Sequence, residues 1–423
     1  MFYMVKKETA EMMNKFNIFL LAMGIAASAG ARDFYVDALR GDDANDALTA
    51  QTAWRTIARA QKQKFVAGDR LLLRSGCMWR LDEPFTLHAK GTASAPVVVT
   101  RYGDGAAPEL RTSLDGLALD WREETNGLWS AACGWPDVGN IVWGDDCAFK
   151  KARLSDVKDD GDFFHDKTAS RLLLKWSKNP RTAFRQMEVC RRLDVMRVIG
   201  VSNAVVDGIA FMYTGAHGMR GWRVDGLVVR NCTFGWIGGS FLSEPGAKPN
   251  RPDGVRYGNG IEIWATDVCR DIRVEGCFFH DVYDTAMTNQ GDGVGELDGM
   301  SIVSNRTLRC EQSYEYWFTN PGYKVGTIEL HGNDFEGAGY GWSHVQRFNK
   351  NATHILAYTV KCQMGRIVVE GNRFGATKQR AIWLFSSILA KECLELKEND
   401  WSGGGDFWWR ESGRWGKAEL GGK

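Results

Sequence analysis

The chain has 423 residues, of which 44% are hydrophobic and 25% charged, and this composition excludes wholesale disorder. Its formal net charge of +1 excludes a global positive field that would recruit nucleic acid or an acidic membrane surface. The 48 glycines suit many tight turns, and the 17 tryptophans suit flat apolar ligands such as sugar rings as well as a hydrophobic core.

Residues 1–31 are predicted to be a secretory signal peptide. A positive start at Lys15 precedes the apolar segment 16–25, and the small residues that follow offer a cleavage site. The apolar segment is shorter than the roughly 20 residues that a membrane span needs, and no later segment is apolar enough to span. We therefore expect no membrane span, and export to a periplasm or beyond the cell.

The ten cysteines all follow this segment. In an exported protein an even number permits disulfides, and the spacing leaves their pairing open. Cys232 and Cys277 occupy equivalent positions of the repeat described below, which favours stacked buried thiols at these two positions. No two cysteines have the Cys-x-x-Cys spacing of a zinc site, so no metal site is predicted.

Residues 32–112 are predicted to form an N-terminal cap and the first coils of a repeating β structure. A turn-rich loop at 41–46 follows the first strand, and residues 52–60 are predicted to form a short helix entered from Thr52. The predicted strands of this region lie at 33–37, 66–76 and 95–103.

The order of these elements resembles the start of secreted right-handed parallel β-helix proteins of the pectate-lyase-like superfamily. The matching features are the Gly41-Asp42 loop, the Trp-Arg-Thr-Ile helix at 54–57 and the Ala-Gly-Asp strand start at 67–69. The resemblance implies an all-β fold, a right-handed parallel β-helix or β-solenoid, whose short N-terminal helix caps the open end of the core. It also implies that the protein acts on carbohydrate.

The motifs of the polygalacturonase-type hydrolases in this superfamily are an Asn-Thr-Asp, an Asp-Asp pair and a Gly-His-Gly. Here only Ala216-His217-Gly218 resembles the last of them, and the pair Asp159-Asp160 lies in an irregular segment. The resemblance therefore implies the architecture, and the chemistry has to be inferred from the local acids.

Residues 113–195 break the rhythm of the repeat. They mix tryptophans and acids with a loop-like stretch at 155–162, and we predict an inserted β-rich subdomain. The main parallel β-helix, with a C-terminal cap, is predicted over residues 196–423.

Six segments of this last region share one frame, apolar-x-apolar-x-x-Asn-x-aromatic, in which cysteine twice replaces the asparagine. The frames begin at Leu227, Ile272, Met300, Ile328, Ile367 and Leu394, at spacings of 45, 28, 28, 39 and 27 residues. The two apolar residues form one strand face turned toward a core, and the asparagine suits a bend in which it satisfies the neighbouring coil. A repeat of this size with short β segments indicates one coil per frame of a β-solenoid.

Two segments carry the same apolar-Glu-apolar-Trp pattern, Ile261–Trp264 and Tyr314–Trp317. Because side chains alternate along a strand, both glutamates and both tryptophans are expected to point outward. Counting eight residues beyond each frame places Met287 in one column with Glu315, and Ser343 and His344 in the next coil of that column.

Glu262 and Glu315 are the candidate catalytic acid and base. They are expected two coils apart, so that their backbones would lie roughly 9–10 Å from each other. Inverting glycosidases hold their two carboxyl groups roughly 6.5–9.5 Å apart. Asp284, from the turn that enters the middle coil, would assist, because neighbouring acids raise one another's pKa until one stays protonated. Alternatively, these acids are ordinary residues of a solvated sheet face.

Side chains that suit sugar binding are predicted around these acids. Tryptophans stack on sugar rings, and His, Gln, Asn and Arg bind hydroxyls or a sugar carboxylate. As alternatives, Asn289 and Gln290 close a turn and His344 is structural. The candidate substrate-binding residues are Trp264, Asn289, Gln290, Trp317, Trp342, His344, Gln346 and Arg347.

The sequence therefore predicts a secreted glycoside hydrolase, inverting, that acts on a polysaccharide or oligosaccharide without a cofactor. One alternative is a polysaccharide lyase acting on a uronate polymer, with Tyr283, His344 and Arg347 as candidate groups and with calcium as the cofactor to expect. The second alternative is a non-catalytic glycan-binding β-solenoid. No nucleic-acid partner is predicted, and the sequence leaves the oligomeric state open.

Overall fold

The structure of the protein is a computed structural model that describes residues 30–264, 267–385, 391–411 and 414–420. The predicted signal peptide, residues 1–31, lies outside these residues except for its last two positions. Of the helices in the described segments, none has both the length and the apolar character that crossing a membrane requires.

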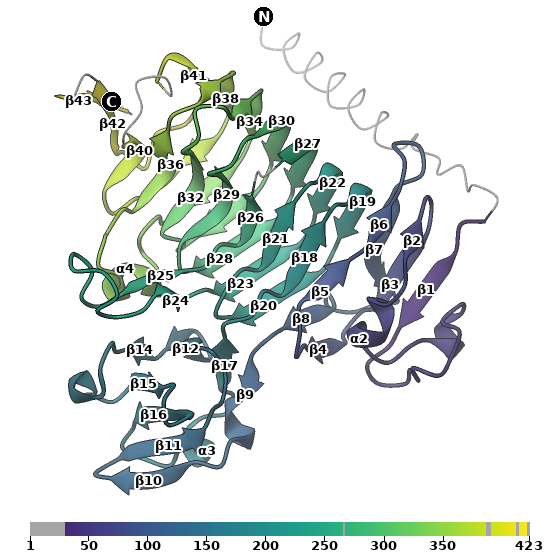
Figure 1. Cartoon of the computed structure of the whole chain (residues 1–423), viewed down its shortest axis with the longest axis vertical. Helices are drawn as coiled ribbons and strands as arrows, with labels where there is room; N and C mark the ends of the chain where they lie inside the picture. Colours follow the sequence, from purple (N-terminus) through teal and green to yellow (C-terminus); the bar gives the residue numbers. More distant parts are fainter. Residues whose placement is uncertain (1–29, 265–266, 386–390, 412–413, 421–423) are drawn as a thin grey trace, which may run out of the picture.

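Three parallel sheets wind into a right-handed parallel β-helix, as predicted (Figure 1). The first sheet runs in the order β1 (Asp33–Val36), β3 (Arg70–Arg74), β7 (Val97–Tyr102), β19 (Ser202–Asp207), β22 (Asp225–Arg230), β27 (Asp267–Glu275), β30 (Gly295–Val303), β34 (Ile328–His331), β38 (Ile367–Glu370) and β41 (Leu394–Lys397). Short strands flank it: β2 (Phe65–Val66), β6 (Ala89–Lys90), β33 (Lys324–Val325) and β37 (Gln363–Met364).

The second sheet carries the candidate site. It runs in the order β5 (Phe85–Leu87), β18 (Met196–Ile199), β21 (Met219–Trp222), β26 (Ile261–Trp264), β29 (Thr285–Gly291), β32 (Gln312–Phe318), β36 (Thr353–Val360), β40 (Arg380–Leu384) and β42 (Asp406–Glu411), with β43 (Arg414–Glu419) antiparallel at its end. The third sheet runs in the order β4 (Met78–Arg80), β8 (Glu109–Arg111), β20 (Ala210–Thr214), β23 (Thr233–Ile237), β28 (Phe278–Val282), β31 (Arg306–Leu308), β35 (Asp334–Glu336) and β39 (Arg373–Phe374).

The predicted repeat frame is confirmed residue by residue. The six residues that begin the frames, from Leu227 to Leu394, lie opposite one another in consecutive coils of the first sheet. The frame asparagines stack as predicted, because the backbone N–H of Asn305 donates to Oδ1 of Asn333 in the next coil at 2.9 Å. Asn333 repeats this bond to Asn372. The ladder therefore satisfies the backbone groups at each bend.

The two frame cysteines are buried thiols, as predicted. Cys232 and Cys277 are each 1% exposed, and their sulfurs donate to backbone carbonyls of neighbouring residues and coils. None of the ten cysteines, all of which lie in described residues, forms a disulfide.

The N-terminal helix is shorter than predicted and begins later. α2 spans Ile57–Ala60, and Thr56 caps it by accepting a hydrogen bond from the Arg59 N–H. Thr52 instead ends a 3-10 turn, Ala50–Thr52. The backbone between the two is extended because Trp54, which is 2% exposed, bridges to Val36 of β1 and enters the core.

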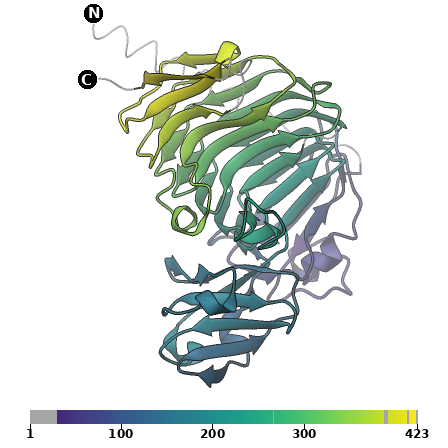
Figure 2. The same cartoon turned by 60° about the vertical axis from the view of Figure 1, so that its left-hand side comes forward.

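The segment from β9 to β17 forms two mainly antiparallel sheets with a hydrophobic core of their own, and only β14 pairs in parallel, with β15, within these described sheets. Figures 1 and 2 show it projecting from one side of the β-helix. One sheet contains β10 (Arg122–Thr125), β11 (Leu128–Ala132), β16 (Arg171–Lys175), β15 (Asp162–Asp166) and β14 (Phe149–Lys150). The other contains β13 (Asp146–Cys147), β12 (Val138–Trp143), β17 (Glu188–Arg191) and β9 (Leu114–Asp115), and α3 (Pro180–Ala183) lies between β16 and β17.

Two further elements lie between this subdomain and the candidate site. They are a hairpin of β24 (Ser240–Ser243) and β25 (Val255–Tyr257), and the one-turn helix α4 (Trp342–Gln346). Both belong to long connections between coils. The hairpin supplies residues to the site, and so does the loop that follows α4.

Candidate active site

Glu262 and Glu315 face the same side of the second sheet, two coils apart. Glu262 on β26 lies opposite Thr288 on β29, which lies opposite Glu315 on β32. The predicted column and alternation are therefore confirmed for the two glutamates. Arg220 on β21 extends the column by one coil beyond Glu262.

The prediction that Met287 shares this column was wrong by one residue. Met287 lies opposite Tyr314 and is fully buried in the core, and Thr288 takes the outward position. Thr307 and Phe279 are aligned, but the bend that follows Thr307 is one residue shorter, and a one-residue shift moves a side chain to the other face. The next member of the column is Leu356, not Ser343 or His344, because these two belong to α4 in the connection before β36.

The three predicted acids line one cavity of about 580 Å³. Trp264 and Trp317 stand beside them with their rings edge to face, at 5.3 Å between centroids. The predicted site residues that line this cavity are Glu262, Asp284, Glu315, Trp264, Gln290, Trp317 and Arg347.

Glu262 lies in a cage of basic and amide groups and is 4% exposed. Its Oε1 is 2.8 Å from Nε of Arg220, and its Oε2 accepts a hydrogen bond from Nδ2 of Asn259 at 3.0 Å. Nε2 of His217 lies 3.5 Å from the same Oε2. Because Nδ1 of His217 accepts the backbone N–H of Asn259, the proton of a neutral His217 is on Nε2, facing Glu262.

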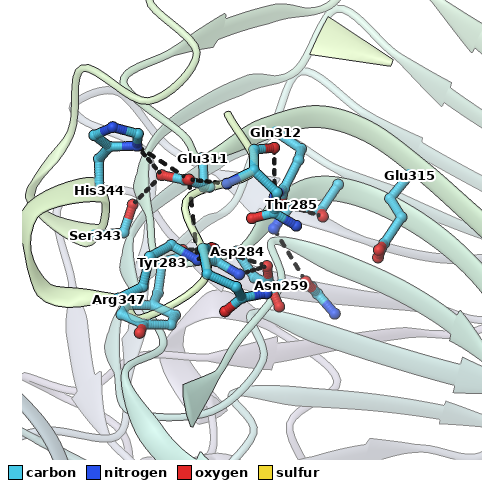
Figure 3. Close-up of polar contacts among 12 residues, drawn as sticks. Asn259, Tyr283, Asp284, Thr285, Glu311, Gln312, Glu315, Ser343, His344 and Arg347 are labelled. Carbon is cyan, nitrogen blue, oxygen red and sulfur yellow. Dashed lines mark hydrogen bonds and ion pairs between the residues drawn. The ribbon is translucent and has the colours of Figure 1, made fainter. Parts of the chain in front are cut away.

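Asp284 is held by Arg347 from the loop between α4 and β36. Both terminal nitrogens of Arg347 donate to Oδ1 of Asp284, at 3.0 Å each (Figure 3). Burial raises the pKa of Asp284, and the charge of Arg347 acts against this rise. Asp284 thus has a cation that favours its ionised form.

Among the described residues, no arginine, lysine or histidine donates a hydrogen bond to Glu315. Its Oε2 accepts from the hydroxyl of Thr288 and from Nε2 of Gln290, each at 3.2 Å. Burial, followed by the nearby charge of Asp284, raises the pKa of Glu315 to about 8. Glu315 is therefore the acid that keeps its proton at neutral pH, and both contacts leave its Oε1 available.

The loop that carries Arg347 folds around a third buried carboxylate, Glu311. Oε1 of Glu311 accepts the backbone N–H of Asn351 at 3.1 Å, and Nδ1 of His344 lies 3.1 Å from the same oxygen. Ser343 donates its hydroxyl to Oε2 at 3.4 Å, and Nε of Arg347 is 3.9 Å from Oε1. Figure 3 shows Glu311 between His344 and Arg347. Glu311 thus anchors both ends of the loop that presents Arg347 to the cavity.

Four predicted substrate-binding residues do not line the cavity, because the structure uses their polar groups for internal contacts. Asn289 points into the core, where its Oδ1 accepts from the Tyr314 hydroxyl. Trp342 donates its indole N–H to the carbonyl of Asp281, and His344 is bound to Glu311. Gln346 donates to the carbonyl of Ala148 and so fastens α4 to the inserted subdomain.

The cavity also contains residues that the sequence reasoning did not include. Among them are Arg192, His217, Arg220, Tyr257, Asn259 and Asn351. His217 belongs to the Ala-His-Gly motif noted above, which is the one sequence signal that pointed to it. Asn259 lies in the Gly-Asn-Gly before β26, and a Cβ on Gly258 would stand 2.1 Å from the Cα of Gly238. Only glycine permits this close approach, which brings Asn259 against His217.

No group of three or more His, Cys, Asp or Glu side chains in the described residues is placed to hold a metal ion. The acids of the cavity are instead paired with arginine, histidine, amide and hydroxyl groups. The arrangement provides one protonated carboxylic acid and two further carboxylates around a space lined by two tryptophans.

No protein-family model and no curated protein matches this sequence. Among solved structures, the chain is similar to XylC in complex with xylose, with a TM-score of 0.53 and 10% identity over 89% of this chain and 71% of XylC. It is also similar to a rhamnogalacturonan lyase, with a TM-score of 0.49 and 11% identity over 93% and 80% of the two chains. A GH136 lacto-N-biosidase from Eubacterium ramulus matches with a TM-score of 0.42 and 13% identity, over 87% of this chain and 55% of its own. The likeness to XylC confirms, at the level of fold, the resemblance to right-handed parallel β-helix proteins.

Proposed function

We propose that this protein is a glycoside hydrolase that inverts the anomeric centre, with Glu315 as general acid and Glu262 as general base. The observation that carries the proposal is a carboxylic acid with a pKa of about 8 that shares one cavity with two further carboxylates. A general acid must hold its proton at the working pH, and burial beside Asp284 gives Glu315 that property.

In the proposed reaction, Glu315 donates its proton from Oε1 to the glycosidic oxygen as the bond from that oxygen to the anomeric carbon breaks. Glu262 takes a proton from a water molecule, whose oxygen attacks the anomeric carbon from the opposite face. A new carbon–oxygen bond replaces the broken one, and the configuration inverts. The two-coil separation of the glutamates, about 9–10 Å between backbones, leaves room for this water.

The remaining residues of the cavity support this division of roles. Asp284, held by Arg347, keeps negative charge next to Glu315 and so favours the protonated acid. Trp264 and Trp317 offer apolar rings on which a sugar ring can stack. A sugar is also the ligand named for XylC, whose fold this chain shares. With the predicted signal peptide, these features support a secreted enzyme that acts on a polysaccharide or oligosaccharide.

The lyase alternative loses two of its three candidate groups. Tyr283 is 2% exposed and lies beneath Arg256 and Trp342, and His344 is bound to Glu311. Only Arg347 lines the cavity, and it is engaged with Asp284. The hydrolase is therefore the function that the geometry supports best.

The test is a product assay of the mature protein on a panel of polysaccharides and oligosaccharides. We expect new reducing ends without unsaturated sugars, and proton NMR of the first product should show the inverted anomer. Ultraviolet-absorbing unsaturated ends would replace the hydrolase with a lyase. Binding without cleavage of any bound glycan would leave only the non-catalytic alternative.

A mechanism-specific control uses Glu262→Gln with added azide. If Glu262 is the base, azide can attack the anomeric carbon without deprotonation and so restore turnover. The product is then a glycosyl azide with inverted anomeric configuration. A retained anomeric configuration in this product would show that Glu262 is not the base of an inverting enzyme.

A further inference from the structure

A second cavity, of about 800 Å³, lies on the same face of the β-helix toward its N-terminal end. Thr86 of β5 and Arg197 of β18 lie on the second sheet within it. The turn after α2 and the turn around β6 supply its other sides, at residues 61–65 and 88–90. We call this cavity the N-terminal groove.

Positive charge dominates the N-terminal groove. Its lining contains Lys62, Lys64, Lys90 and Arg197 but only one carboxylate, Glu83, which gives a local net charge of +3 with histidine neutral. The whole chain has a net charge of +1, so the groove is a local concentration of charge and not part of a general basic surface. Charges this close together act within one Debye length, about 8–10 Å in physiological salt.

Internal contacts leave most of this charge available. Glu83 is contacted by the amide of Gln61, and Lys90 donates to the carbonyl of Gly200 at 2.7 Å. Arg197 is paired with Asp194 at 2.7 Å through Nε. Lys62, Lys64 and Lys90 are exposed and line the groove.

The groove is continuous in register with the candidate active site. Thr86 lies opposite Arg197, Arg197 opposite Arg220, and Arg220 opposite Glu262. These residues occupy consecutive coils of one outward column, so Arg197 lies two coil spacings, about 10 Å along the axis, from Glu262. A glycan that is bound along this face and extends from Glu262 toward the N-terminal end of the β-helix therefore enters the groove.

The opposite end of the same column is aromatic. Beyond Glu315 it continues with Leu356, Trp383 and Trp408. Arg380 lies over the rings of Trp383 and Trp408, so this end combines aromatic rings with a stacked cation. An extended ligand therefore meets a lysine-lined groove on one side of the acids and a tryptophan surface on the other.

We propose that the N-terminal groove binds an anionic segment of the glycan whose glycosidic bond lies between Glu262 and Glu315. The chemistry that the groove recognises is a carboxylate or sulfate group on a sugar one or more residues away from the bond that is cleaved. This inference rests on the proposed function for the identity of the ligand as a glycan. The groove binds the anion whether or not cleavage occurs. It gives the substrate a fixed direction, with its charged end toward the N-terminal coils.

The test measures binding to the full mature chain that carries Glu315→Gln, so that hydrolysis does not enter. The probes are dextran sulfate, carboxymethyl dextran and unmodified dextran of matched length, titrated by calorimetry at low and physiological salt. Two double variants are compared, Lys62→Glu with Lys64→Glu in the groove, and Lys158→Glu with Lys178→Glu on the inserted subdomain. Both pairs change the net charge equally and alter exposed lysines.

We expect one or both charged dextrans to bind, and the sulfated and carboxylated probes show which anion is preferred. The groove variant should lose at least about tenfold in affinity, and the subdomain variant less than about twofold, since only groove lysines contact the ligand. Equal losses in both variants, or no difference between charged and unmodified dextran, would overturn the proposal. A Glu315 variant that binds while the unaltered protein cleaves no glycan would refute the hydrolase and leave the groove proposal standing.

Discussion

Arg347 holds Asp284 through one carboxylate oxygen only, with both terminal nitrogens 3.0 Å from Oδ1. Burial raises the pKa of both acids, that of Glu315 to about 8. Arg347 opposes this rise at Asp284 through its charge and its direct hydrogen bonds, and the charge of Asp284 in turn adds to the rise in the pKa of Glu315. The first predictions concern this difference.

Glu315→Gln is expected to lower kcat by about 10²–10⁴-fold, the usual contribution of a general acid. In the unaltered protein the activity should fall above about pH 8, because Glu315 then loses its proton. A pH–rate profile on the substrate found by the product assay checks this. Glu329→Gln, at a half-buried glutamate on the first sheet, is the matched control and should leave the profile unchanged.

Asp284→Asn should move the basic limb of the pH–rate profile to lower pH. The negative charge of Asp284 raises the pKa of Glu315, so its removal lowers that pKa and Glu315 loses its proton earlier. The measurement is the apparent upper pKa of kcat/KM in the variant and in the unaltered protein. If the basic limb of the variant stays at the same pH, Asp284 does not raise the pKa of Glu315.

Glu315→Gln should also stabilise the folded protein, more strongly at higher pH. The folded pKa is about 8 and the ordinary value is 4.5, so between these values the folded state binds more protons than the unfolded state. The stability contributed by the protonated acid is complete below about pH 4.5 and is lost as the pH rises through about 8. Denaturant unfolding at about pH 5 and about pH 8 should show the gain from Glu315→Gln mainly at about pH 8. An equal gain at both values would contradict the raised pKa.

Glu311→Gln is expected to loosen the loop from α4 to β36 without unfolding the β-helix. The amide keeps the shape of Glu311 but replaces one acceptor oxygen by a donor, and the N–H of Asn351 and the ring of His344 compete for what remains. Hydrogen exchange at residues 347–351 should accelerate, and KM should rise because Arg347 and Asn351 line the cavity. Unchanged exchange in this loop would show that the loop does not depend on Glu311.

A buried ion pair joins the inserted subdomain to the wall of the site. Nζ of Lys150 lies 2.9 and 2.7 Å from the two oxygens of Asp137, and Oδ2 of Asp137 also accepts the backbone N–H of Phe241 in β24. Burial lowers the pKa of Lys150 to about 7, which reflects the cost of placing its charge there. Lys150→Met should cost at most about 3–5 kcal/mol of unfolding free energy, because it removes the nearest cation of Asp137. Lys167 at 3.7 Å and His165 at 3.5 Å remain beside the carboxylate.

The double variant Asp137→Asn with Lys150→Met is the control for this pair. It removes both charges and should be more stable than Lys150→Met alone, as measured by denaturant unfolding. A double variant that is less stable than either single variant would show that the pair is not the source of the loss.

The sequence was sufficient to predict the coils from Leu227 to Leu394 and the direction in which their strand side chains point. The frame from Leu227 to Leu394 is in register throughout, because the apolar pair of each coil has to face one shared core. The same alternation points Glu262 and Glu315 outward, and the apolar-Glu-apolar-Trp pattern that their strands share relates them to one column. The sequence was insufficient to predict the column position where a bend differs by one residue in length, as before Met287. The repeat frame contains no signal for such a difference.

In the candidate site, likewise, the strand residues could be predicted from the sequence and the residues of the connections could not. The sequence itself determined the outward direction of the strand side chains in the second sheet, because period-two alternation is a local property of a strand. These residues are Glu262, Trp264, Glu315 and Trp317. Tertiary structure alone decided the partners that tune them. His217 and Asn259 come from connections that differ in length, and Arg347 reaches Asp284 only because a loop folds around Glu311. Such contacts join residues far apart in the chain, and their geometry depends on how several irregular connections pack together, which no local pattern encodes.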